Sequence, residues 1–172
     1  THDQEEALTL SDRIAVMSEG EVLEIAAPGQ LYEAPRSRFV ADFIGAMNFF
    51  EGTVTANTTQ GITISTDALG EVDSFCEESF SIGTKVWVAV RPEKLQPAFT
   101  PPEGESTYIK GRMGPSAYLG DRSHFYVHVD QREEPILVAL QNLERSLDHL
   151  SGANQPVWLG WSKGALVVLA RN

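Results

Sequence analysis

The chain has 172 residues, of which 42% are hydrophobic and 22% charged, so it can build one large or two small folded domains. Its formal net charge of −11 disfavours a nucleic-acid partner, because such a surface repels a phosphodiester backbone. No apolar run approaches a membrane span, and the single cysteine, Cys76, excludes an internal disulfide. We therefore expect a soluble protein of a reducing, cytoplasmic compartment.

The first third of the chain is expected to mix helices with one hairpin. A helix begins at Asp3, which can cap it, and the runs 14–17 and 22–25 flank a Ser-Glu-Gly turn. Pro28 then starts a short helix that Pro35 ends. A further helix follows a serine cap and ends at a glycine, with four apolar residues expected on one face: Phe39, Val40, Phe43 and Ile44.

From about Met47 the sequence changes to short β-prone runs separated by Gly, Pro, Asn and Asp, which is typical of small barrels or a sandwich. A weak internal repeat favours two barrels, because EGTV precedes VWVAVRPEKLQ and KGRM precedes VWLGWSKGALV. PAFTPPEGEST, rich in Pro and Glu, predicts a linker between them. The predicted fold is mainly β, α+β overall, with an N-terminal helix-hairpin-helix segment at 1–46, a first barrel at 47–100, a linker at 101–106 and a second barrel at 107–172.

Few patterns in the chain carry chemistry. None of the four lysines is followed by Ser or Thr, so the phosphate loop G-x-x-x-x-G-K-[ST] is absent. His124 and His128 would share one strand face and could bind a metal with Asp130, but a solvated face is the favoured interpretation, and we predict no metal site. His2, just before the first helix, is placed to meet a phosphate or is an ordinary loop residue.

The stretch EVDSFCEE combines carboxylates with an aromatic ring. Its acidic residues are Glu71, Asp73, Glu77 and Glu78. Such a stretch is most often a solvated loop, although carboxylates around an aromatic ring could also hold an organic cation. Acidic neighbours raise the pKa of a thiol, so Cys76 is not expected to be reactive.

THDQEEALTLSDRIAVM resembles the switch-histidine segment of ABC-transporter ATPases. The pattern G-E-V-x-E-I-x-x-P-x-x-L-Y-x-x-P, followed by FVADFIG, resembles the end of their nucleotide-binding domain in importers of sugars, polyamines and iron. NFFEGTV, VAVRPEKL, AYLGDRSHFYVHV and VALQN are similar to the regulatory extension of that group, a tandem pair of small OB-like barrels called the TOBE domain. The most similar group is the polyamine (putrescine or spermidine) importers.

This resemblance implies a set of expectations. The chain would be the C-terminal part of an ATP-binding subunit that couples ATP hydrolysis, with Mg²⁺, to polyamine uptake. His2 would be the switch histidine that contacts the γ-phosphate of ATP, but the chain alone, lacking the upstream motifs, would bind no cofactor and have no activity. Its barrels would pair with those of a second copy in a homodimer. The other partners would be the transmembrane permease subunits and, indirectly, a substrate-binding protein, at the cytoplasmic face of the membrane.

Three alternatives remain open at this stage. By fold analogy alone the barrels could be an oligonucleotide-binding OB module, which the net charge of −11 opposes. The barrels could be a ligand-sensing module for a polyamine or an oxyanion, with Glu71, Asp73, Glu77 and Glu78 as candidate ligand-binding residues. The parent protein could also be the ATPase subunit of a sugar or iron(III) importer, because substrate choice rests on other subunits.

Overall fold

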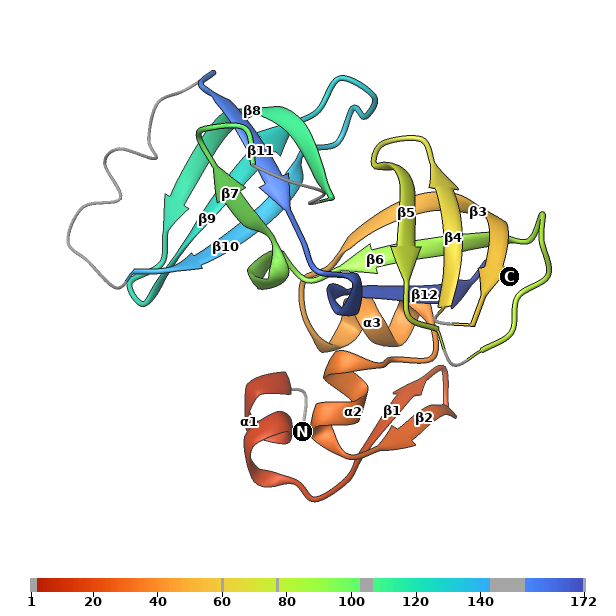
Figure 1. Ribbon diagram of the computed structural model, residues 1–172. Coiled ribbons are helices and arrows are strands. Elements are labelled where there is room, and N and C mark those ends of the chain that lie inside the picture. Colours follow the sequence, from red (N-terminus) through yellow and green to blue (C-terminus); the bar gives the residue numbers. More distant parts are fainter. Residues whose placement is uncertain (1–2, 60, 77, 103–106, 143–153, 172) are drawn as a thin grey trace.

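The computed structural model describes residues 3–59, 61–76, 78–102, 107–142 and 154–171. An N-terminal unit of helices and one hairpin lies against two curved antiparallel sheets (Figure 1). Its elements are α1 (Gln4–Leu10), β1 (Ile14–Ser18), β2 (Glu21–Ala26), α2 (Pro28–Glu33) and α3 (Arg38–Ile44). Among the described residues, no helix has the length and hydropathy needed to span a membrane.

Local signals in the sequence explain the N-terminal unit. Asp3 caps α1, and its Oδ1 accepts a hydrogen bond of 3.0 Å from the Glu6 N–H. The β1–β2 hairpin turns through Glu19 and Gly20, which both have positive φ (52° and 86°), as in the two-residue turns that match strand twist. Pro28 is the first residue of α2. These predicted elements are confirmed.

The face that α3 buries differs from the expected one. Val40, Ala41 and Ile44 are buried, whereas Phe39 and Phe43 are 48% and 43% exposed. The two phenyl rings instead stack on each other on the solvent side, with centroids 5.9 Å apart. The prediction that all four large apolar residues face inward was wrong, because a spacing of three and four residues allows two adjacent stripes and packing selects only one.

The remaining elements form two sheets of five strands each. In chain order they are β3 (Asn48–Thr58), β4 (Gly61–Thr66), β5 (Gly70–Ser74), β6 (Lys85–Val90), the 3₁₀ turn η1 (Pro92–Lys94), β7 (Gln96–Ala98), β8 (Tyr108–Tyr118), β9 (Arg122–His128), β10 (Ile136–Gln141), β11 (Pro156–Gly160), the 3₁₀ turn η3 (Lys163–Ala165) and β12 (Leu166–Ala170). The first sheet has the order β12-β6-β3-β4-β5, and the second has the order β10-β9-β8-β11-β7. The mainly β prediction is confirmed.

The two sheets repeat one plan and exchange their last strands. Strands β3, β4, β5 and β6 of the first sheet match β8, β9, β10 and β11 of the second, and a 3₁₀ turn follows β6 and β11 alike. The strand after each turn then crosses over, since β7 pairs with β11 and β12 pairs with β6. The expected sequential units 47–100 and 107–172 therefore each give one strand to the other sheet. Periodicity identifies a strand but not its partner, which explains the difference.

Two further strands occupy stretches expected to be loop or linker. β5 lies within the acidic stretch, where Val72 is 1% exposed and alternates with exposed neighbours. β7 covers the start of the proline-rich stretch, whose residues 103–106 lie outside the described part. A single apolar residue between charges is too short an alternation to predict a strand.

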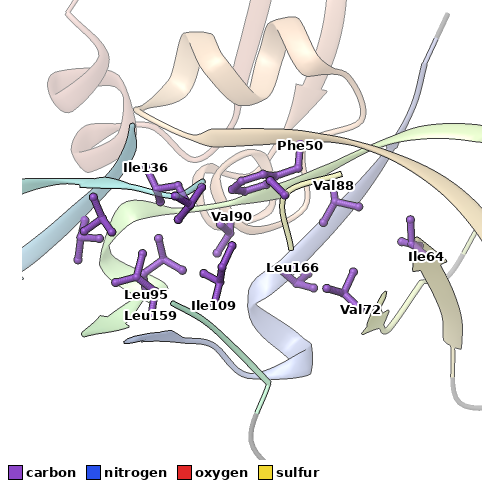
Figure 2. Close-up of a cluster of buried hydrophobic side chains, with 14 of the residues drawn as sticks. Phe50, Ile64, Val72, Val88, Val90, Leu95, Ile109, Ile136, Leu159 and Leu166 are labelled. Carbon is purple, nitrogen blue, oxygen red and sulfur yellow. The ribbon is translucent and has the colours of Figure 1, made fainter. Parts of the chain in front are cut away.

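One hydrophobic core runs through both sheets. Phe50 and Val90 of the first sheet, Ile136 and Leu159 of the second, and Leu95 at the crossing belong to the same cluster of buried side chains (Figure 2). A smaller cluster lies within the N-terminal unit. Because the large core is shared, the two barrels form one packed body.

Candidate functional sites: a buried arginine and an open groove

The acidic residues singled out from the sequence do not form one cluster. Glu71 and Asp73 are exposed on the same face of β5, and Glu78 lies beyond the end of that strand. Asp73 is occupied, because its Oδ1 accepts a hydrogen bond from Thr63 Oγ1 at 2.9 Å and its Oδ2 pairs with Lys163 Nζ at 3.0 Å. The bond from Lys163, and then that from Thr63, lowers the pKa of Asp73. Glu77 and His2 lie outside the described residues.

A groove of about 1020 Å³ opens beside β12 and is called here the β12 groove. Its lining comes from the end of α2 and the connection to α3, from the β3–β4 hairpin tip, from residues around Phe75 and Glu78, and from Leu166–Leu169 of β12. Leu166 and Leu169 are buried, whereas Phe75 is 60% exposed and Glu78 is exposed. The lining therefore combines the buried leucines of β12 with exposed side chains such as Phe75 and Glu78.

The histidines of β9 lie on its outer face. Phe125 and Val127 point into the core, and the alternating His124 and His128 are half-buried and exposed. No group of three or more His, Cys, Asp or Glu side chains among the described residues has the arrangement of a metal site. The absence of a metal site stays a prediction for the whole chain.

A buried arginine joins the N-terminal unit to the barrels. Arg91 follows the last residue of β6 and is 2% exposed. One terminal nitrogen, Nη1, donates to the carbonyl oxygens of Ala41, Gly45 and Ala46 at 3.1, 2.7 and 3.2 Å. Nη2 donates to the carbonyl oxygen of Tyr32 at 3.0 Å, and the guanidinium lies 4.1 Å from the Tyr32 ring centre. A single side chain thus binds carbonyls at the ends of both α2 and α3.

Neighbouring residues extend this contact, called here the Arg91 joint. The Tyr32 hydroxyl donates to Glu93 Oε1 at 2.6 Å, and Lys94 Nζ pairs with Glu33 Oε1 at 3.2 Å. Burial lowers the pKa of Arg91, while the nearby Tyr32 and Glu93 oppose that effect. Helix C-termini concentrate partial negative charge on their unpaired carbonyls, so they suit a buried cation whose hydrogen bonds within the described part of the chain all go to backbone carbonyls.

The joint predicts an elevated phenol pKa. Burial, and then the hydrogen bond to Glu93, raises the pKa of Tyr32 from 10.0 to about 12. Because the folded state favours the neutral phenol, its stabilising contribution is complete below pH 10 and is lost as the pH rises through the folded pKa. Subtracting the tyrosinate absorbance of the Tyr32→Phe variant from that of the wild type should isolate this transition. A difference curve centred at the ordinary pKa would contradict the buried hydrogen bond.

A second polar contact joins the two barrels. The buried side-chain amide of Asn48 donates from Nδ2 to the Leu137 carbonyl at 2.9 Å and accepts from the Leu137 N–H at 2.8 Å. Arg132 Nη1 also donates to the Phe49 carbonyl at 2.7 Å. The sequence interpretation missed Asn48 and Arg91. Their position in the sequence could have identified them, because each is a polar residue at the end of an apolar strand.

Comparison with known proteins gives a consistent result. The family model described as "TOBE domain" matches residues 77–169. The spermidine/putrescine import ATP-binding protein PotA of Trichodesmium erythraeum is 36% identical over 179 residues, which cover 100% of this chain and 46% of that protein. The putrescine transport ATP-binding protein PotG of Escherichia coli is 36% identical over 172 residues, covering 98% and 45%. The chain therefore spans about half the length of these relatives.

A solved structure gives the fold independently of sequence. The cytoplasmic molybdate-binding protein ModG superposes with a TM-score of 0.62 at 9% identity, covering 72% of this chain and 96% of that protein. At this identity the likeness concerns the fold alone. It supports the assignment of both sheets as OB-like barrels.

Proposed function

Because the chain belongs to the TOBE domain family, we propose that it is the C-terminal regulatory and dimerisation part of the ATP-binding subunit of a polyamine importer. The observation that carries the proposal is the match of the whole chain, including the N-terminal unit, to subunits whose names specify spermidine/putrescine import or putrescine transport. The match begins ahead of the TOBE region, which supports reading residues 1–46 as the end of the ATPase domain.

The Arg91 joint gives this proposal a mechanical basis. If residues 1–46 end the ATPase domain, then α2 and α3 are the last elements before the barrels. Arg91 binds the C-terminal carbonyls of both helices from the end of β6. A movement of α2 and α3 is then transmitted to the barrels, and a contact between the barrels of two copies restrains the ATPase domains in turn.

The complete subunit would supply the chemistry that this chain lacks. ATP and Mg²⁺ would bind the upstream half, and His2 would donate a hydrogen bond to the γ-phosphate across the subunit pair. The partners proposed are a second copy, the permease subunits and, through them, the substrate-binding protein, at the cytoplasmic face of the membrane. A sugar or iron(III) importer is the alternative parent.

A chimera tests the assignment of His2. The upstream part of the E. coli relative, which this chain does not match, is joined to residues 1–172, and ATP hydrolysis is measured with and without His2→Ala. We expect no hydrolysis by the chain alone, hydrolysis by the chimera, and a loss of about 100-fold or more in the variant, because one positioned donor to developing phosphoryl charge is worth that much.

The matched control is His124→Ala, which replaces a half-buried histidine on the outer face of β9 and should leave the rate unchanged. Hydrolysis by the chain alone, or a chimera that is active and insensitive to His2→Ala, would contradict the proposal.

A further inference from the structure

Charge is divided unevenly between the two sheets. The strands of the first sheet contain one cation, Lys85, and three carboxylates, Glu51, Glu71 and Asp73. The five strands of the second sheet contain no Asp or Glu. Their cationic and imidazole side chains are Lys110, Arg112, Arg122, His124 and His128. In a chain of net charge −11, the second sheet is therefore a local positive region.

Five side chains of the second sheet share its outer side and are called here the basic face. Tyr108, Lys110 and Arg112 are exposed and alternate along β8 with buried residues, so they point the same way. β8 lies between β11 and β9 (Figure 1), and the register places Trp158 opposite Lys110 and His128 opposite Arg112. Lys110 Nζ lies 5.6 Å from the Trp158 ring centre. The face thus combines cations with aromatic rings.

The imidazole of His128 lies against the backbone of Gly114. A Cβ at Gly114 would come within 2.9 Å of His128 Nε2, so the glycine provides the space that the ring occupies. Because His128 is opposite Arg112, the imidazole extends the basic face across β9. Even a neutral imidazole keeps one N–H donor, so this side chain can donate to a carboxylate without being protonated.

The two fixed charges of the basic face have no carboxylate partner within the described part of the chain. The cationic side chains that do form ion pairs there are Lys94, Arg122, Arg132, Lys163 and Arg171. The described carboxylates in the turns between β8 and β10 are Asp121, Asp130, Glu133 and Glu134. None of these four forms an ion pair with Lys110 or Arg112. The basic face can therefore bind carboxylates from another molecule.

A second copy of the chain fits this face poorly. A two-fold contact through the basic face would bring Lys110 and Arg112 toward the same cations of the other copy, and like charges in an interface are unfavourable. A contact with the acidic strands of the first sheet gains little, because Glu51 and Asp73 already pair with Arg171 and Lys163. The charge arrangement therefore favours a different protein.

The spacing of the cations selects the form of the partner. Alternate residues of an antiparallel strand lie about 7 Å apart, which is also the spacing of carboxylates at alternate positions in an extended peptide. A nucleic acid fits less well, because two fixed cations are few beside the roughly 6–10 phosphate contacts that proteins commonly make. The net charge of −11 also repels a polyanion at long range.

We propose that the basic face binds an extended, acidic polypeptide segment of another protein. Carboxylates at alternate positions of the segment pair with Lys110 and Arg112, and His128 donates a further hydrogen bond. Tyr108 and Trp158 provide the apolar contacts, in keeping with the enrichment of Tyr, Trp and Arg among the residues that dominate binding energy. The inference goes beyond the proposed function and does not depend on it.

The test uses the full chain and a fluorescent peptide in which one phenylalanine and two glutamates alternate with serine, to match Tyr108, Lys110 and Arg112. Fluorescence anisotropy should show saturable binding. Backbone amide NMR signals should shift in β8, β9 and β11 but not in β5. The same peptide with lysine in place of both glutamates should bind at least about tenfold more weakly.

Matched charge reversals locate the site. Arg112→Glu should weaken binding of the glutamate peptide about tenfold and Lys110→Glu about fivefold. Lys85→Glu makes the same change of charge at an exposed lysine of the first sheet, which forms no ion pair in the described part of the chain, and should alter binding less than about twofold. All three positions are exposed, so the core is untouched.

Several results would overturn the proposal. They are an absence of saturable binding, equal binding of the lysine peptide, equal effects of the reversals at Arg112 and Lys85, and NMR shifts confined to other strands. Short oligothymidine and vesicles containing phosphatidylserine are measured in parallel. Tighter binding of either one than of the glutamate peptide would assign the basic face to a nucleic acid or to a membrane surface, and would also overturn the proposal.

Discussion

Replacing Arg91 with alanine should lower the free energy of unfolding by about 3–5 kcal/mol, measured by urea denaturation followed through tryptophan fluorescence. The substitution removes four hydrogen bonds from a charged donor to backbone carbonyls, together with the stacking on Tyr32. Carbonyls left unpaired in a buried position keep their desolvation cost without a compensating partner. The loss is therefore expected to exceed that of an ordinary surface substitution several-fold.

Two matched variants distinguish the loss of the Arg91 contacts from a general effect of removing a positive charge. Arg91→Lys keeps the charge but cannot reach both helix ends or stack, so an intermediate loss is expected. Arg112→Ala removes an exposed arginine of β8 and should change the free energy of unfolding by no more than about 0.5 kcal/mol. In Arg91→Ala, trypsin should also cleave faster after Arg36, between α2 and α3, and after Arg38, the first residue of α3, while the barrels remain folded. Unchanged stability and unchanged cleavage would show that the guanidinium does not hold the two helices.

The sequence predicted those elements whose signals are local. Asp3 and the Glu19-Gly20 turn each act through neighbours within a few residues. Ser37 does so as well, since its hydroxyl accepts from the Val40 N–H at 3.2 Å. Alternating apolar residues also identified most strands of both sheets, because a half-buried strand has that period by geometry. These features need no knowledge of the rest of the chain.

Features that depend on distant partners were not predictable in this way. The exchange of β7 and β12 depends on which of two similar apolar edges each strand meets, and the period of each strand is the same in either sheet. Likewise, the choice of Val40 and Ile44 over Phe39 and Phe43 depends on what packs against α3.

The candidate sites also divide into features that the sequence makes visible locally and features that depend on distant residues. The acidic stretch was conspicuous in the sequence, yet Asp73 proves to be engaged by Lys163, which lies 90 residues away. Arg91 was not singled out, although it makes the densest set of hydrogen bonds to the N-terminal unit among the described residues. A buried charge becomes recognisable only when its acceptors are assembled, and here they come from helix ends about 50 residues earlier.

The exchanged strands lead to the prediction with the largest effect. Neither fragment 47–102 nor fragment 107–171 should fold by itself, because the first lacks β12 and the second lacks β7. Without β12 the β6 edge is unpaired and the buried Leu166 and Leu169 are missing, each worth about 2–5 kcal/mol when truncated in a core. The combined loss from the two leucines is comparable to the whole free energy of unfolding of a typical domain, about 5–15 kcal/mol.

Circular dichroism and NMR of each fragment, and of their equimolar mixture, give the readout. Each fragment should lack dispersed amide signals, and the mixture should recover them, because together the fragments supply both complete sheets. The continuous fragment 47–171 is the control, since it keeps every strand of both sheets and omits only the N-terminal unit. A folded, monomeric 47–102 would show that the first barrel closes without β12 and that the exchange contributes little. The shared core, in which Phe50, Ile136 and Leu166 belong to one cluster, argues for the opposite result.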